Sequence, residues 1–182
     1  MRPNKTKARL LAGESVYGVV VRFPAPALVE MFGHLGFDFV MIDREHGSLS
    51  LEGAEELLRA ADAVDITPIV RVPHAHPKEI SCTLDIGAQG VQVPDVATRA
   101  DAQALVRAAK YWPVGARGMA MARAGDYGMT LDQMDFVRRA NDETMIVAHV
   151  ESLEAIANLP DMLTVDGIDV FFIGPADLSQ IG

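Results

Sequence analysis

The feature that most constrains the fold of this chain is a regular alternation between two kinds of segment. Short runs rich in β-branched and aromatic residues recur along the sequence, and stretches with helical spacing separate them. In the clearest of these stretches, Leu51, Leu57 and Leu58 share one helix face, with Glu55 and Arg59 on the opposite face. Strands that alternate with helices predict a parallel sheet, because each helix carries the chain back to the start of the next strand. The expected strands span residues 16–22, 37–42, 67–72, 89–93, 144–150 and 168–173.

Local signals mark the ends of several expected helices. Pro77 suits a first helical turn, and Gly87 suits the end of a helix. Thr98 and Ser152 each precede a helical stretch whose first backbone N–H groups their hydroxyls can cap.

One segment, residues 111–130, breaks the alternation. It contains four glycines and a proline and has no clear period. A loop of this length inside a compact domain is uncommon and is often functional. It is either a lid or binding loop, or an irregular connection that packs against a neighbouring subunit.

Two parallel architectures accommodate six strands. An open doubly wound sheet usually has a glycine-rich phosphate turn after its first strand, but the sequence after Arg22 is FPAPAL. A (β/α)₈ barrel instead gathers polar residues at the C-terminal ends of its strands, as this chain does. We therefore expect a TIM barrel, with Val91, Val147 and Phe172 among its inward-facing residues.

The length of the chain bears on this barrel. A (β/α)₈ barrel takes about 250 residues, whereas this chain has 182 and stops just after its sixth expected strand. We expect residues 1–182 to form one incomplete barrel domain of about six βα units, the recorded part of a longer polypeptide.

Composition excludes several classes of protein. The chain has 25 acidic and 16 basic residues, for a net charge of −9, which argues against a nucleic-acid-binding face. Its single cysteine, Cys82, excludes an internal disulfide. Its apolar runs are too short to span a membrane, and its N-terminus lacks the apolar stretch of a signal peptide. We predict a cytoplasmic protein that binds neither nucleic acid nor membrane.

Polar side chains follow four of the expected strands. In a parallel barrel these ends meet at one mouth, so His46, Arg71, Glu151 and Asp177 should converge. Glu151 and Asp177 can share a hard divalent cation such as Mg²⁺ or Mn²⁺. A 2-oxo acid could fill the open metal positions, Arg71 could stabilise a developing enolate, and His46 could exchange protons near neutral pH.

Each of these residues alone also has a structural interpretation. His46 could lie in a solvated turn, Arg71 could be a buried arginine paired with a carboxylate, and Glu151 and Asp177 could be helix-start acids. Four polar strand ends at one face favour the catalytic interpretation.

The positions of the lysines argue against Schiff-base chemistry, which needs a lysine on an inward strand position. The four lysines lie in the N-terminal tail or at expected helix ends: Lys5, Lys7, Lys78 and Lys110.

Six motifs, in order, resemble the metal-dependent class II pyruvate aldolases, which include 4-hydroxy-2-oxoheptanedioate aldolase and 2-dehydro-3-deoxyglucarate aldolase. The motifs are IDREHG, VRVP, LDIGAQGVQVPDV, YWPVGARG, HVES and FFIGPADLS. The resemblance covers nearly the whole chain. It implies a (β/α)₈ barrel, assembly into a homo-oligomer (a trimer or hexamer), and a Mg²⁺, Mn²⁺ or Co²⁺ cofactor. It also implies cleavage of a 4-hydroxy-2-oxo acid to pyruvate and an aldehyde through a metal-bound pyruvate enolate.

The resemblance also implies a role for each matching residue. They are His46 as the base, Asp43 and Asp85 as its supports, Arg71 as the enolate-stabilising group, Glu151 and Asp177 as metal ligands, and Gly174 and Ala176 as backbone contacts to pyruvate.

This sequence departs from the family pattern at His149, where the family usually has glutamine. Strand side chains alternate, so His149 faces the same way as Glu151, one layer deeper. It is either a hydrogen-bonded interior histidine behind the metal ligand or a direct influence on the metal's water. In both cases it borders the predicted substrate site.

Two rival functions remain open at this point. A related lyase could act on a CoA thioester, as citrate-lyase-like subunits do, although His46 argues against it. The short chain could also be an inactive fragment or an interaction subunit.

Overall fold

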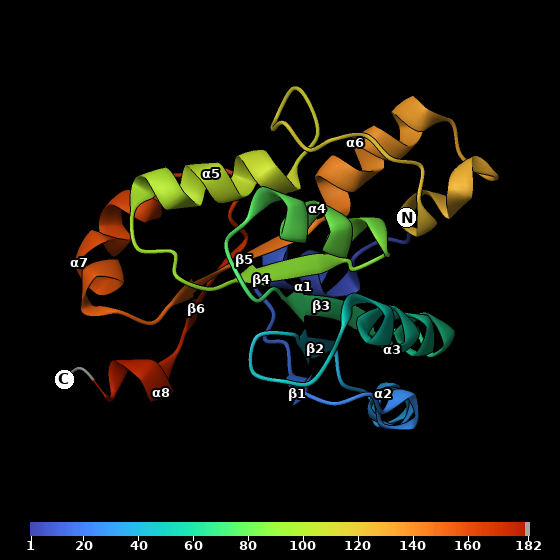
Figure 1. Cartoon of the computed structure of the whole chain (residues 1–182), viewed down its shortest axis with the longest axis horizontal. Coiled ribbons are helices and arrows are strands. Elements are labelled where there is room, and N and C mark those ends of the chain that lie inside the picture. The colour runs from blue at the N-terminus through green and yellow to red at the C-terminus, as the bar shows by residue number, and fades with distance from the viewer. Residues whose placement is uncertain (181–182) are drawn as a thin grey trace.

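The computed structural model describes residues 1–180 and contains one six-stranded parallel sheet, with the strands in chain order (Figure 1). Every expected strand is confirmed, within two residues at each end. The strands are β1 (Gly18–Val21), β2 (Phe39–Asp43), β3 (Thr67–Arg71), β4 (Gly90–Val93), β5 (Met145–Val150) and β6 (Val170–Ile173).

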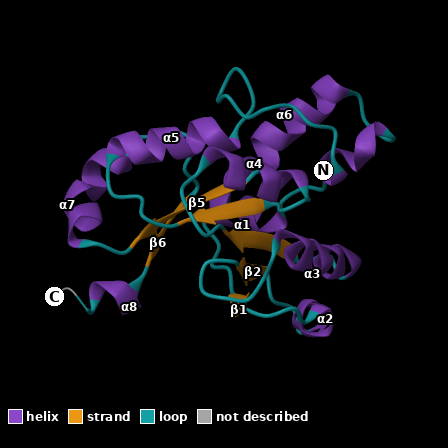
Figure 2. Ribbon diagram, viewed as in Figure 1, coloured by secondary structure: helices purple, strands orange, loops and turns teal. Residues whose placement is uncertain are grey.

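Helices alternate with the strands and lie around the outside of the curled sheet (Figure 2). This half-barrel of βα units confirms the predicted partial (β/α)₈ fold. The α-helices are α1 (Lys5–Leu11), α2 (Pro26–His34), α3 (Leu51–Ala63), α4 (Pro77–Asp85), α5 (Arg99–Ala109), α6 (Gln133–Glu143), α7 (Leu153–Met162) and α8 (Pro175–Leu178), and a 3₁₀ helix, η1, spans Arg123–Gly128.

The predicted helix ends are confirmed. Pro77 opens α4, and Gly87, with φ of +105°, follows its C-terminus. Thr98 caps α5 in a reciprocal box with Asp101, and the Ser152 hydroxyl accepts a hydrogen bond from the N–H of Ala155, 3.0 Å away. These caps fix where each helix starts relative to the preceding strand, and therefore fix the loops at the mouth.

Apolar side chains pack on both faces of the sheet. The larger cluster lies between the sheet and its helices, and a smaller one, with Ile69, Met145 and Val147, fills the inside of the half-barrel. The prediction for Val147 is confirmed, and Phe172 packs on the same inner side, against the His149 ring. The prediction for Val91 is wrong, because side chains alternate along β4: Val91 packs in the outer cluster.

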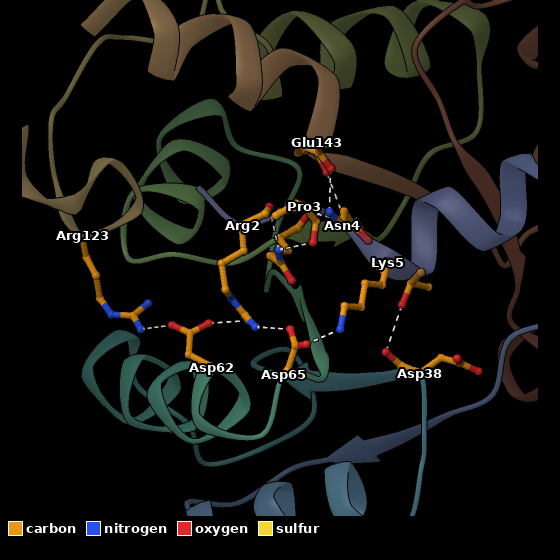
Figure 3. A network of polar contacts seen from close by, with 11 residues as sticks. Arg2, Pro3, Asn4, Lys5, Asp38, Asp62, Asp65, Arg123 and Glu143 are labelled. Carbon is orange, nitrogen blue, oxygen red and sulfur yellow. Dashed lines mark hydrogen bonds and ion pairs between the residues drawn. The ribbon is translucent and has the colours of Figure 1, made fainter. Parts of the chain in front are cut away.

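The N-terminal segment closes the bottom of the half-barrel, the end at which the strands begin (Figure 3). Leu10 of α1 packs against the inner cluster. The buried Asn4 side chain donates hydrogen bonds to the carbonyl oxygens of Gln89 and Glu143, at 3.0 and 3.1 Å. This leaves the opposite end, where the strands finish, as the mouth. Among residues 1–180, no helix is both long and apolar enough to cross a membrane.

The irregular segment 111–130 lies at the bottom as well. Arg117 pairs with Asp85 at the end of α4, at 2.6 Å, and Arg123 donates to the carbonyl oxygen of Ile86, at 2.8 Å. The segment therefore does not cover the mouth of its own chain.

Candidate active site

A buried ion pair joins the ends of β2 and β3. Asp43 and Arg71 are register partners, and the Arg71 guanidinium binds both carboxylate oxygens, with Nε 2.9 Å from Oδ1. Arg22, after β1, adds a contact of 3.1 Å to Oδ2. Burial alone would raise the pKa of Asp43, but the hydrogen bonds from Arg71 and the following backbone hold it below its ordinary value. The pair fixes the guanidinium at the mouth.

The loop after β2 is folded around the same carboxylate. The backbone N–H groups of Glu45 and His46 both donate to Oδ1 of Asp43, at 3.1 Å. A Cβ on Gly47 would lie 2.4 Å from the carbonyl oxygen of Arg22, so only glycine fits there. The His46 side chain is 54% exposed. Asp43 thus supports the backbone of His46 and does not touch its imidazole.

Glu45 also lies in the site, although it was not among the residues predicted from the sequence. Its Oε2 lies 3.2 Å from Nη1 of Arg71 and 3.6 Å from Nε2 of His46. Burial raises the pKa of the Glu45 carboxyl, although Arg71 and His46 oppose the shift. In the sequence, only the position of Glu45 between Asp43 and His46 suggested a role in the site. That position does not show which way the side chain points.

Glu151, just past β5, presents its carboxylate to two neighbours. Oε1 accepts a hydrogen bond of 2.8 Å from the backbone N–H of Asp95, and Oε2 lies 3.1 Å from Nδ1 of His149. His149 is 3% exposed and packs edge-on against Phe172. Burial lowers the pKa of His149 against the opposing charge of Glu151. His149 is thus an interior residue in contact with Glu151.

Gly174 makes room for this histidine. A Cβ there would lie 2.4 Å from Nε2 of His149, so the glycine is required by close approach. Directly after it, α8 carries Ala176 and the partly buried Asp177, whose charge acts on His149. The ends of β5 and β6 therefore lie together at the mouth.

Buried polar atoms without a protein partner gather at this mouth. Within residues 1–180 they include Nε2 of His149 and both amide atoms of Gln92. In the same part of the chain, Nδ1 of His149 and Oε2 of Glu45 also lack a well-aligned hydrogen bond, although they lie near Glu151 and Arg71. Gln92 is fully buried and is the register partner of Arg71. Such atoms usually face water, an ion or a ligand.

The donors at the mouth fit a divalent cation with open positions. Glu151 and Asp177 supply hard carboxylate oxygens, the ligands that Mg²⁺ and Mn²⁺ prefer. The described residues hold no group of three acidic, histidine or cysteine side chains that could bind a metal. A cation there would take its remaining ligands from water or substrate, which the unpartnered atoms nearby could orient.

The structure thus brings most of the predicted site residues to the mouth. Asp85 is the exception: it pairs with Arg117 at the bottom, and within one chain it does not approach His46. The residues at the mouth are Asp43, His46, Arg71, His149, Glu151, Gly174, Ala176 and Asp177.

Known proteins match the chain along almost its whole length. Residues 17–181 match the family model described as HpcH/HpaI aldolase/citrate lyase. The chain belongs to this family. A 4-hydroxy-2-oxovalerate aldolase from Novosphingobium aromaticivorans is 38% identical over 97% of this chain and 66% of its own length. A 4-hydroxy-2-oxo-heptane-1,7-dioate aldolase from Escherichia coli is 36% identical over 97% of this chain and 67% of its own.

Among solved structures, citrate synthase SbnG superposes with a TM-score of 0.85 and is 36% identical, over 96% of this chain and 66% of its own. The chain thus spans about two thirds of the length of these relatives. The predicted resemblance to pyruvate aldolases is confirmed.

Proposed function

We propose that the protein is a divalent-metal-dependent aldolase that cleaves a 4-hydroxy-2-oxo acid to pyruvate and an aldehyde. One observation carries the proposal: the Arg71 guanidinium, locked by Asp43, lies at the same strand ends as the Glu151 and Asp177 carboxylates. A fixed cation beside two oxygen ligands suits a substrate with adjacent carboxylate and keto oxygens. The names of the two aldolase relatives agree with this substrate class.

Glu151 and Asp177 would hold the metal. When bound, the cation supplies Lewis-acid polarisation of the substrate's keto group. Asp95 orients Glu151 through its backbone N–H, and His149 packs behind the same carboxylate. These contacts hold the ligand in one position before substrate binds.

Arg71 binds and stabilises negative charge in this proposal. Guanidinium has five N–H groups, of which Asp43 takes two and Glu45 lies near a third. The remaining N–H groups are available to substrate oxygen. They stabilise the enolate that develops as the C3–C4 bond breaks, because their position is fixed in advance.

His46 moves the proton. Its exposed imidazole accepts the proton of the C4 hydroxyl, the C3–C4 bond electrons pass into the enolate, and C4 becomes the aldehyde carbon. Glu45, 3.6 Å from Nε2, stabilises the imidazolium that forms. Protonation of the enolate at C3 then gives pyruvate. Gly174 and Ala176 supply backbone contacts to pyruvate.

The likeness to citrate synthase SbnG favours a second candidate, a citrate-forming condensation at the same mouth. An aldol cleavage and an aldol condensation both need a stabilised enolate, so the residues above would serve either. The substrate that is turned over separates the two candidates.

The test is to supply the protein with a set of 4-hydroxy-2-oxo acids and, separately, with citrate, with Mg²⁺ or Mn²⁺ and with a chelator. The proposal expects metal-dependent release of pyruvate from at least one hydroxy-oxo acid. Turnover of citrate alone would replace the proposal with the second candidate. By the same family resemblance, we propose that the protein acts in the cytoplasm as a homo-trimer or homo-hexamer.

A further inference from the structure

A cleft lies at the bottom of the half-barrel, at the opposite end from the mouth. It encloses about 720 Å³ between α3, the turn before β4, the N-terminal segment and the segment around η1. Its charged lining residues are Arg2, Arg59, Asp62, Arg123, Asp126 and Arg139. Four arginines and two aspartates thus line the cleft, and one of the arginines, Arg59, pairs with Glu55 of its own helix, 2.5 Å away.

The acidic side chains do not neutralise these arginines one for one. Asp62 is shared: Oδ1 lies 2.5 Å from Arg2, and Oδ2 pairs with Arg123 (Figure 3). Arg2 also reaches Asp65, but Asp65 is itself shared with Lys5. Two carboxylates thus serve three cationic side chains, so Asp62 does not fully neutralise the two arginines that it bridges.

Arg139 adds a cation from another element, α6. It is exposed on α6, and no carboxylate within residues 1–180 pairs with it. The second lining aspartate, Asp126, accepts a hydrogen bond from the Thr130 hydroxyl at 2.6 Å and does not pair with Arg139. Among the described residues, the cleft therefore has one free guanidinium, on α6, in addition to the two arginines that share Asp62.

The backbone beside the cleft is held in an unfavourable conformation. Asp126 and Tyr127 both have positive φ, +51° and +54°, a region that side chains other than glycine rarely adopt. Consecutive residues of this kind cost free energy, and they are found most often at binding and switch sites. Here they place Tyr127, 61% exposed, at the rim of the cleft.

We propose that this cleft binds a small anion with at least two negative charges, such as a phosphate ester or a polycarboxylate. Arg139, which has no carboxylate partner within residues 1–180, and Arg2 and Arg123, which share one, supply charge-assisted hydrogen bonds. The lining also includes the apolar side chains of Met1, Ala88 and Leu131. The site is separate from the mouth and does not depend on the proposed reaction.

The experiment is calorimetric titration of the metal-free protein with inorganic pyrophosphate at constant ionic strength, and with a tricarboxylate in a second arm. The matched variants are Arg139→Gln and Arg138→Gln, adjacent exposed residues of α6, of which only Arg139 lines the cleft. Arg138 instead pairs with Asp135. Both substitutions remove one surface charge, so both variants should fold.

We expect one binding event per chain, weakened about tenfold or more by Arg139→Gln, as for a lost hydrogen bond to a charged group. Arg138→Gln should change the dissociation constant by less than about twofold, because an exposed charge outside the cleft contributes little. The arm with the higher affinity identifies the kind of anion. Three results would overturn the proposal: no binding in either arm, equal weakening by both variants, or binding that Arg139→Gln leaves unchanged.

Discussion

Gln89 and Gln92 lie three residues apart around β4, and both are buried, but within residues 1–180 only the Gln89 amide has hydrogen-bond partners. At the bottom, the Gln89 amide donates to the carbonyl oxygens of Arg2 and Pro3, at 3.1 and 3.3 Å. Toward the mouth, neither the amide nitrogen nor the oxygen of Gln92 has a partner. Buried polar groups are normally paired, and the exceptions need a reason. We infer that the Gln89 amide stabilises the fold at the bottom, whereas the Gln92 amide keeps its hydrogen-bonding capacity for a ligand at the mouth.

The largest effect should come from the proposed metal ligands at the mouth. Glu151→Ala or Asp177→Ala should abolish pyruvate release, because a single carboxylate cannot hold the cation in place. Glu151 is 13% exposed and Asp177 is partly buried, but neither belongs to the apolar core, so the thermal midpoint of the metal-free protein should fall only slightly. Pyruvate release and thermal unfolding, measured on the same samples, check this. A variant that loses stability but keeps its turnover would make the carboxylate a structural group.

Arg71→Lys should have the next largest effect. Lysine keeps the charge but cannot bind Asp43 with two parallel hydrogen bonds or present N–H groups at the same angle. We expect turnover to fall by about 10²–10³, the loss seen when an oxyanion donor is removed. The measurement is kcat for pyruvate release, and near-normal kcat would assign Arg71 to stability alone.

At the bottom, Lys110 should make stability depend on pH. Its ammonium donates to the carbonyl oxygens of Asn141 and Thr144, and burial lowers its pKa from 10.5 to about 8. The unfolded chain therefore holds more protons between these values, so the free energy of unfolding should rise with pH from about 8 to 10.5, by at most about 3 kcal/mol.

Urea unfolding at the two ends of this pH range measures that rise. Lys110→Met should remove it, whereas Lys78→Met, at the exposed start of α4, should keep it. A rise that survives in Lys110→Met would show that other groups cause it.

The smallest effects should come from substitutions of the two glutamines, which test directly whether the paired and the unpaired amide have different roles. Gln89→Leu leaves two main-chain carbonyls without a partner and should lower the free energy of unfolding by about 1–3 kcal/mol, with kcat unchanged. Gln92→Leu removes groups that have no partner, so stability should stay within about 1 kcal/mol or increase, while kcat/KM falls. Denaturant titration and steady-state kinetics on both variants test this. The reverse pattern would contradict the division between mouth and bottom.

The sequence predicted the strands and helix caps well because these depend on local pattern. Thr98, Ser152 and Pro77 act on backbone groups within three residues, so their roles are visible without a fold. That Arg71 and Asp43 lie close together could also be predicted, because neighbouring parallel strands end at the same edge of the sheet.

Contacts that depend on the direction of a side chain could not be predicted from the sequence. The inclusion of Glu45 depends on how one loop turns, and the placement of Val91 depends on the phase of β4. Asp85 was expected near His46 because of its motif, but α4 runs back from the mouth and carries Asp85 to the bottom. The role of Gln92 could not be predicted, because the sequence does not show that its amide is buried and has no hydrogen-bond partner among the described residues.

The most direct test of the account is the exchange of pyruvate methyl protons with deuterated water, followed by NMR. We expect exchange that requires Mg²⁺ or Mn²⁺, stops with a chelator, and disappears in Glu151→Ala. Borohydride added with pyruvate should leave the protein unmodified, because no lysine lies among the residues at the mouth. Exchange that persists with a chelator and is trapped by borohydride would contradict the account.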